Sequence, residues 1–359
     1  MRLADLGWDE GFARDFAAVA GDAPDLCPGR VAVEFNYLYR IYVEEGELEA
    51  MLSGRLKHHA SGRGDLPAVG DWVVIRRRPG EARGAILSVL PRRARFSRRT
   101  AGHTTDEQVV AANVSIIFIV MAFDGDFSVR RLERYLLMAR ESGAAPVVLL
   151  TKPDLAQDVP AAVAAAAAVS GEAPVHVVSP RTGAGLETVR ARLTSGVTAA
   201  LLGSSGVGKT TIINALTGNE ARRTRAVRAS DSKGRHTTTH RELVLLPDGG
   251  LIIDTPGMRE LQLWEAGEGV RETFDEIEAL APECRFSDCR HREEPGCAVK
   301  TAVSDGRIPA ARLESYHRLQ DELAFLARQQ DERAHIDEKR RGRVASRALR
   351  QHLKTKRLT

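Results

Sequence analysis

The sequence lacks a hydrophobic run long enough to cross a membrane, and it contains few cysteines. Its longest apolar stretch extends from Val114 to Phe123, whereas a membrane-spanning helix needs roughly 18 or more apolar residues. The N-terminus carries Asp5, Asp9 and Glu10 and no apolar signal core, which argues against secretion. Three of the four cysteines cluster near a histidine, which favours a metal site in a reducing compartment over disulfides. We therefore expect a cytoplasmic protein that does not contact a membrane.

Positive charge is concentrated in two stretches. Of the 52 Lys and Arg residues, nine lie between Lys339 and the C-terminus, where no Asp or Glu occurs. A second stretch, from Arg76 to Arg99, holds nine arginines and Glu81 as its one acidic residue. Either stretch could be a solvated surface. Two such stretches flanking one domain favour contact with a polyanion, because neutralising phosphates releases counterions.

The N-terminal part of the chain predicts a helix followed by a barrel. Residues 1–28 form a predicted helical extension, with apolar residues at helical spacing. These residues are Trp8, Phe12, Phe16 and Val19. Residues 29–100 contain five short strand patterns separated by turns, among them one from Leu48 to Leu56. Such a pattern indicates a small barrel, of either the oligonucleotide-binding or the SH3-like kind.

The rest of the chain predicts an α/β domain, a helical domain and a tail. Residues 101–270 alternate buried strand patterns with helical segments, which predicts a doubly wound domain with a mostly parallel sheet. Residues 271–335 contain the cysteine cluster and a long charged helix, so we expect a mainly helical domain there. Residues 336–359 form a basic tail.

One glycine-rich segment matches a phosphate-binding loop. Residues 203–210 fit the pattern G-x-x-x-x-G-K-[ST] between a predicted strand and a predicted helix. The glycines let backbone N–H groups approach phosphates, and the helix N-terminus adds positive potential. We expect Lys209 to contact the β- and γ-phosphates and the Thr210 hydroxyl to bind Mg²⁺. The predicted GTP-binding residues here are Gly203, Ser204, Ser205, Gly206, Val207, Gly208, Lys209, Thr210 and Thr211.

A second phosphate-site motif, D-T-P-G, follows another buried strand pattern at residues 254–257. We expect Asp254 to hold Mg²⁺ through a water and the Gly257 N–H to contact the γ-phosphate. Between the two motifs lies a polar, glycine-containing stretch that is expected to close on the nucleotide. One of its threonines should complete the Mg²⁺ shell; Thr238 is favoured, and Thr237 is the competing candidate.

The residue that follows this second motif predicts slow intrinsic hydrolysis. A glutamine often orients the attacking water at that position, but here the residue is Met258, whose side chain does not hydrogen-bond to water. His236, in the polar stretch, is the catalytic candidate that would position water once a partner orders the loop. The alternative is a solvated loop histidine.

A base-reading motif, Thr151-Lys152-Pro153-Asp154, precedes the phosphate loop. Asp154 can accept hydrogen bonds from N1–H and the 2-amino group of guanine; adenine lacks that amino group, so the motif selects GTP over ATP. Thr151 stands where asparagine is commoner. Ser179, after another predicted strand, is expected to line the base. Because the ordinary order of the two motifs is reversed, the sequence implies a circular permutation.

The cysteine cluster predicts a structural zinc site. Cys284, Cys289, His291 and Cys297 supply three thiolates and one imidazole, which matches a closed tetrahedral Zn²⁺ site with no open position. Free buried cysteines are the alternative.

These motifs closely resemble the RsgA (YjeQ) family of bacterial small-ribosomal-subunit-dependent GTPases. The resemblance rests on residues 203–210, 234–238, 254–257 and 289–299. It implies a circularly permuted P-loop GTPase domain, an oligonucleotide-binding (OB) fold for the barrel and a zinc-binding C-terminal domain.

The same resemblance implies a function in late maturation of the 30S subunit. The protein is expected to bind 16S rRNA and to hydrolyse GTP to GDP with stimulation by the subunit. It is expected to carry one zinc per chain and Mg²⁺ with GTP, and to be monomeric. The alternative is an RNA-binding module that nucleotide merely stabilises, without subunit-stimulated turnover.

Overall fold

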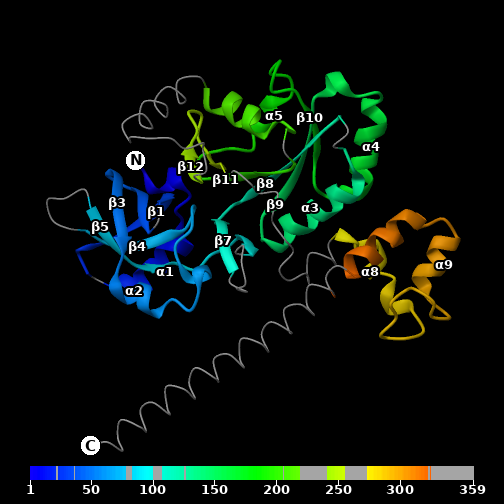
Figure 1. Ribbon diagram of the computed structural model, residues 1–359, viewed down its shortest axis with the longest axis horizontal. Helices are drawn as coiled ribbons and strands as arrows, with labels where there is room; N and C mark the ends of the chain where they lie inside the picture. The colour runs from blue at the N-terminus through cyan, green and yellow to red at the C-terminus, as the bar shows by residue number, and fades with distance from the viewer. Residues whose placement is uncertain are drawn as a thin grey trace, which may run out of the picture. The chain divides into compact units, whose positions relative to one another are not determined.

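The computed structural model describes most of the chain, and its described residues fall into two compact units (Figure 1). Described are residues 1–21, 23–35, 37–77, 83–99, 107–124, 127–204, 206–218, 241–254, 273–321 and 324. The first unit contains a barrel and an α/β domain. Described residues from Glu276 onward belong to the second unit. Within the described ranges, no helix is long and apolar enough to span a bilayer.

Five strands close into the predicted barrel. They are β1 (Leu26–Phe35), β2 (Leu38–Val43), β3 (Gly46–Leu52), β4 (Trp72–Arg77) and β5 (Arg83–Val89). The order β1-β2-β3-β5-β4 closes because β4 also pairs with β1. Inward-facing apolar side chains such as Ile41, Ile75 and Ile86 fill the interior. Gly29 makes room for them, since a Cβ there would lie 2.6 Å from both Ile41 and Ile75.

The structure corrects the predicted strand from Leu48 to Leu56. Strand β3 ends at Leu52, and the chain continues into helix α2 (Gly54–His59). Ser53 starts that helix, because its hydroxyl accepts a hydrogen bond from the Leu56 N–H at 3.2 Å. A capping serine therefore outweighed the apolar pattern on which the longer strand was predicted.

The N-terminal segment contains two short helices instead of one long one. The 3₁₀ helix η1 (Leu3–Leu6) ends at Gly7 (φ 86°), and α1 (Glu10–Ala20) begins after Asp9, whose carboxylate caps it. Trp8, between the helices, packs against Trp72 of β4 with ring centroids 4.7 Å apart. The segment thus anchors to the barrel through aromatic rings.

The α/β domain has a sheet in the order β10-β9-β8-β11-β13-β12. Its strands are β8 (Ile116–Ala122), β9 (Ala145–Thr151), β10 (Val175–Val178), β11 (Thr198–Leu202), β12 (Glu242–Leu245) and β13 (Leu251–Asp254). All neighbours are parallel except β12, which runs antiparallel to β13. The predicted mostly parallel sheet is confirmed.

Helices cover both faces of this sheet, as a doubly wound fold requires. Helix α3 (Val129–Glu141) packs on β8, β9 and α4 (Val159–Ser170). Residues of α5 (Leu186–Arg190) and of the helix over residues 209–218 join a separate buried core with Phe118 and Val120 of β8. Strands β6 (Arg95–Arg99) and β7 (Glu107–Ala112) form a separate two-stranded sheet.

A buried arginine joins the barrel to the α/β domain. The Arg30 guanidinium, on β1, donates hydrogen bonds to the carbonyl oxygens of Gly70 (3.2 Å), Asn113 (3.1 Å) and Leu6. These three carbonyls belong to the barrel, to the segment before β8 and to the N-terminal segment. Burial lowers the pKa of Arg30 to about 9, so the side chain stays charged at neutral pH and fixes the three segments together.

The barrel also adds a strand to the edge of the α/β sheet. Strand β1 pairs antiparallel with β12 at Val33 and Glu242. One residue further along β12, the Leu243 carbonyl accepts a hydrogen bond of 3.2 Å from the hydroxyl of Tyr42. Through this pairing the two folds share one continuous sheet.

Several arginines of the basic stretch are paired with carboxylates inside the protein. Arg76 lies 2.9 Å from Asp25, and Arg77 pairs with Glu45. Arg93 pairs with Asp9 and holds the pKa of that carboxyl at about 2. This stretch therefore has a structural role that the sequence did not reveal, and its contact with a polyanion stays a prediction.

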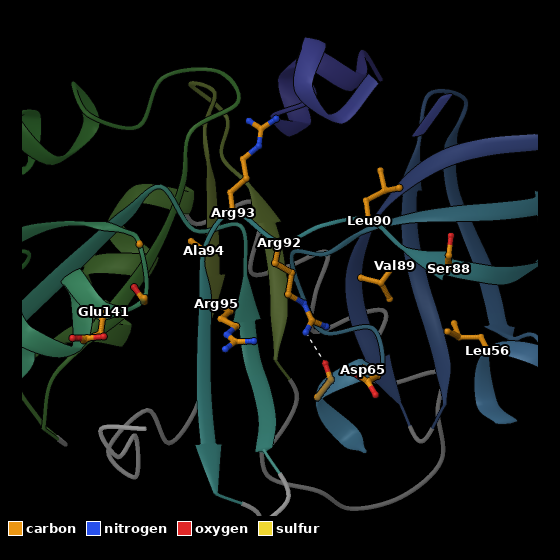
Figure 2. Close-up of a pocket in the computed structure, with 13 residues that line it drawn as sticks. Leu56, Asp65, Ser88, Val89, Leu90, Arg92, Arg93, Ala94, Arg95 and Glu141 are labelled. Atoms are coloured by element: carbon orange, nitrogen blue, oxygen red, sulfur yellow. Dashed lines mark hydrogen bonds between the residues drawn. The ribbon is translucent and has the colours of Figure 1, made fainter. Parts of the chain in front are cut away.

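Arg92 forms the most buried of these pairs. It contacts both carboxylate oxygens of the fully buried Asp71, at 2.8 and 2.7 Å, and donates to the Gly64 and Leu66 carbonyls. It lines a cavity of about 640 Å³ between the barrel and the end of α3 (Figure 2). Figure 2 shows Arg92, Arg93 and Arg95 projecting in different directions from the segment that lines this cavity.

Arg92→Ala is expected to lower the free energy of unfolding by about 3–5 kcal/mol at pH 7, because it leaves a buried carboxylate without its hydrogen-bonded cation. Burial already raises the pKa of Asp71, and loss of Arg92 raises it further. A carboxyl with a raised pKa in the folded state binds more protons there than in the unfolded state. The loss of stability should therefore be smaller at pH 4 than at pH 7.

Urea unfolding at the two pH values measures this difference. Arg76→Ala is the matched control, since both members of its pair with Asp25 are largely exposed and its loss should cost less than about 1 kcal/mol. Equal losses for Arg92→Ala at both pH values would contradict the expected role of Asp71.

The second unit is mainly helical. Helix α8 (Asp275–Glu278) leads into it, followed by η5 (Ala281–Glu283), α9 (Ala298–Ser304) and a helix over residues 310–321. The last helix is tied to α8 by two side chains: Arg312 pairs with Glu276, and the Tyr316 hydroxyl donates to Glu278 at 2.9 Å.

Candidate nucleotide and metal sites

The glycine-rich segment joins β11 to the helix over residues 209–218, as predicted. Gly203 (φ 153°) lies against β8, where a Cβ would come within 2.2 Å of the Val120 carbonyl oxygen, so no other residue fits. The Lys209 ammonium donates to the carbonyl oxygens of Gly203 (2.7 Å) and Ser204 (2.6 Å). A cation thus lies across a loop that leads into a helix N-terminus, an arrangement that suits a phosphate chain.

Thr151 ties the base-reading segment to the phosphate loop. This residue ends β9 and is buried, and its hydroxyl lies 2.6 Å from the Val207 carbonyl oxygen and 3.2 Å from that of Met121. A hydroxyl has one proton to donate, so the shorter contact, to Val207, is the principal hydrogen bond. Threonine thus makes a direct link between the two motifs at the place where asparagine is commoner.

The other predicted base-site residues lie at the same edge of the sheet. Thr151 and Val178 are aligned at the carboxyl ends of the parallel strands β9 and β10, so the segments holding Asp154 and Ser179 leave the sheet side by side. Asp154 is exposed in the 3₁₀ helix η3 (Pro153–Leu155). Ser179 is buried, and its N–H donates to the Ala184 carbonyl at 2.8 Å.

The structure places only part of the predicted Mg²⁺ site. Asp254 ends β13, which pairs with β11 beside the phosphate loop, and Thr210 and Thr211 lie in the first turn of the helix that follows the loop. The remaining predicted site residues lie outside the described residues. They are Ser205, His236, Thr237, Thr238, Gly257 and Met258.

Two contacts at this edge were not predicted from the sequence. Lys152 (φ 57°) places its ammonium 2.6 Å from Asp124, which follows β8 at the same edge. Arg131, in the first turn of α3, donates to the hydroxyl of Ser204 at 3.1 Å. For the contact between Lys152 and Asp124, the one signal in the sequence was that Asp124 directly follows a buried strand pattern. The contact between Arg131 and Ser204 left no signal in the sequence, because it joins residues 73 positions apart.

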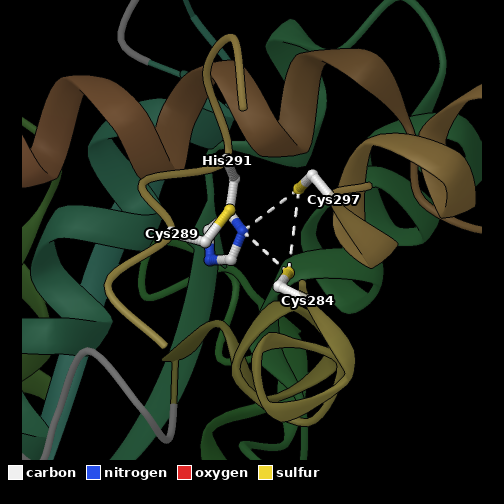
Figure 3. Close-up of side chains that lie close together, drawn as sticks. All are labelled: Cys284, Cys289, His291 and Cys297. Atoms are coloured by element: carbon white, nitrogen blue, oxygen red, sulfur yellow. Dashed lines mark hydrogen bonds between the residues drawn. The ribbon is translucent and has the colours of Figure 1, made fainter. Parts of the chain in front are cut away.

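The four predicted metal ligands converge in the second unit (Figure 3). The ligand atoms of Cys284, Cys289, His291 and Cys297 all lie within 4.8 Å of one another. The sulfurs of Cys284 and Cys297 are 3.8 Å apart, and the His291 Nδ1 lies 3.5 and 3.4 Å from them. Four residues separated by up to thirteen positions thus form one cluster.

These distances fit a tetrahedral zinc ion. With Zn–S bonds of about 2.3 Å and Zn–N bonds of about 2.0 Å, tetrahedral angles separate two sulfurs by about 3.8 Å and sulfur from nitrogen by about 3.5 Å. Burial lowers the pKa of His291, which favours the neutral imidazole that a metal needs. The cluster is therefore compatible with zinc, with Nδ1 as the histidine ligand.

The comparisons with known proteins agree with this geometry. The family model for the RsgA GTPase matches residues 89–264. A relative from Opitutus terrae, named small ribosomal subunit biogenesis GTPase RsgA, is 48% identical over 92% of both chains. A relative of the same name from Methanosarcina acetivorans is 44% identical, over 90% of this chain and 85% of its own.

Solved structures show the same fold. The crystal structure of YjeQ from Thermotoga maritima is 27% identical, with a TM-score of 0.63 over 83% of this chain and 99% of its own. The structure of YloQ, described as a circularly permuted GTPase, is 22% identical, with a TM-score of 0.62 over 85% and 97% of the two chains, and supports the fold alone. The predicted permutation is confirmed, and the chain belongs to the RsgA GTPase family.

Proposed function

We propose that this protein is a GTPase that binds the 30S ribosomal subunit and acts in its late maturation. The observation that carries the proposal is the direct hydrogen bond between Thr151 of the base-reading segment and Val207 of the phosphate loop. It holds the two halves of a guanine-nucleotide site together at one edge of the sheet. The curated relatives are named small ribosomal subunit biogenesis GTPases.

Within this proposal, each side of the site has a separate task. Asp154 accepts the N1–H and 2-amino hydrogens of guanine, with Thr151, Lys152 and Ser179 supporting the base. Residues 203–211 surround the phosphates, where Lys209 neutralises charge.

Mg²⁺, when bound, would neutralise further phosphate charge, and Thr210, Thr238 and Asp254 are the residues proposed to hold it. The Gly257 N–H donates to the γ-phosphate, and His236 positions the attacking water when the subunit orders its loop. Met258 leaves intrinsic hydrolysis slow.

The other parts of the chain support binding to the subunit. The barrel is the proposed contact for 16S rRNA, since OB folds bind oligonucleotides on one face. The cysteine cluster holds one structural zinc. We further propose that the protein acts in the cytoplasm as a monomer.

The proposed domain division follows the sequence. It comprises a helical extension (1–28), an OB barrel (29–100), a permuted GTPase domain (101–270), a zinc domain (271–335) and a basic tail (336–359). The boundary between residues 28 and 29 falls within strand β1, the first strand of the barrel, which begins at Leu26.

GTP hydrolysis measured with and without purified 30S subunits tests this function. We expect the subunits to raise the steady-state rate at least about ten-fold, because a side chain positioned for general acid–base catalysis contributes roughly 10²–10⁴-fold. Binding to subunits without stimulation would favour the alternative, a nucleotide-stabilised RNA-binding module. In the same assay His236→Ala should lose the stimulated part of the rate; full stimulated turnover would remove His236 from the catalytic site.

A further inference from the structure

Helix α3 begins with two arginines where helix stability alone would disfavour them. Arg130 and Arg131 lie in its first turn, which contains no acidic residue. The N-terminus of a helix is the positive end of its macrodipole, so cations there destabilise the helix. The Ser128 hydroxyl already caps this helix. The two arginines therefore require another explanation.

Arg131 has a partner in the phosphate loop. Its guanidinium donates to the hydroxyl of Ser204 at 3.1 Å, and the side chain is half-buried. The carbonyl oxygen of the same serine accepts a hydrogen bond from Lys209 at 2.6 Å. Two cations, from two different helices, thus converge on one residue of the loop. Arg130, by contrast, is exposed.

The attachment of α3 to the fold does not depend on this contact. Leu132, Leu136 and Leu137 bury the apolar face of the helix. At its opposite end Arg140 donates to the Thr273 hydroxyl at 2.9 Å and to the Ser170 carbonyl at 3.0 Å. The helix is therefore anchored along its length by other residues.

We propose that Arg131 is a positioning residue of the phosphate site, which fixes Ser204 and adds positive charge beside Lys209. This inference rests on the proposed function, because it presumes that the loop binds guanine nucleotides. The attraction of a fixed cation grows with the charge of the ligand. Since a triphosphate carries more negative charge than a diphosphate, Arg131 favours GTP over GDP.

Calorimetric titration with GDP and with a non-hydrolysable GTP analogue tests the proposal. Arg131→Ala should weaken binding of the GTP analogue about ten-fold and that of GDP about three-fold, as expected for loss of a charge-assisted hydrogen bond and of one nearby charge. Arg131→Lys, which keeps the charge, should restore most of the preference for GTP. Arg130→Ala is the matched control: it removes the same charge one residue away and should change both affinities less than about two-fold.

A second variant separates positioning from folding. Ser204→Ala leaves α3 intact and should weaken binding of the GTP analogue, and its effect should not add to that of Arg131→Ala, because both remove one interaction. Fully additive effects, or an unchanged ratio of GTP to GDP affinity in Arg131→Ala, overturn the proposal. Wild-type protein that binds neither nucleotide would instead overturn the proposed function.

Discussion

Asp154→Asn is expected to lower the affinity for GTP roughly 10³- to 10⁴-fold and to create affinity for xanthosine triphosphate. A site built to hydrogen-bond its ligand discriminates by about 10⁴–10⁵-fold, and the exposed position of Asp154 places the expected loss below that range. Asparagine presents a donor toward the 2-amino group of guanine, so that group loses its acceptor. Xanthine has a carbonyl oxygen there, which accepts from the new amide. Competition binding against both triphosphates measures the exchange.

A neighbouring aspartate supplies the control for this experiment. Asp158 caps α4 by accepting from the Ala161 N–H at 2.9 Å, and asparagine caps a helix equally well. Asp158→Asn should therefore leave both affinities within about two-fold of wild type. Equal losses of GTP affinity in the two variants, or no gain for xanthosine triphosphate in Asp154→Asn, would show that Asp154 does not read the base.

Cys297→Ser is expected to abolish stoichiometric zinc and to unfold the segment around the cluster. Structural zinc contributes about 10–16 kcal/mol of apparent binding free energy in small domains. Cys297 is buried and also accepts a hydrogen bond from the Lys300 N–H at the start of α9. Metal analysis and limited proteolysis should show loss of zinc together with new cleavage between residues 284 and 304.

Acidification provides a second measure of the same site. Zinc ligands must be deprotonated, so zinc affinity falls as the pH falls. Because burial lowers the pKa of His291, its imidazole stays neutral to a lower pH than an exposed histidine, and zinc release should begin at a lower pH than from a site with an exposed histidine ligand.

Cys27→Ser is the matched control, since Cys27 lies on β1 of the barrel and outside the cluster. It should keep one zinc per chain. Retention of zinc by Cys297→Ser would contradict the predicted ligand set.

Much of the α/β domain could be predicted from the sequence. Helix α3 and strand β11 begin and end where local signals in the sequence lie, because Ser128 caps the helix and because β11 is a continuous apolar run before a glycine. The metal cluster was equally predictable, since its four ligands lie close together in the sequence and their chemistry is distinctive.

Other features depend on contacts between distant residues and left no local signal. The pair Arg92–Asp71 and the contact Arg131–Ser204 join residues 21 and 73 positions apart. In the sequence, Arg92 was one arginine of a basic stretch. Only the fold shows that a buried carboxylate faces it. The role of Thr151 was hidden for the same reason, because its partner is the backbone carbonyl of Val207 and not a side chain.

The pairing of β1 with β12 also limits how the protein can be divided. Strand β12 is the last strand of the α/β sheet, and its outer side is covered by the barrel. An unpaired sheet edge is a template for association with another chain. A fragment made by cutting away the barrel would expose that edge and self-associate. Proteolytic or genetic separation of the two folds therefore removes the strand that covers this edge, and the α/β domain alone is expected to be less soluble than the two folds together.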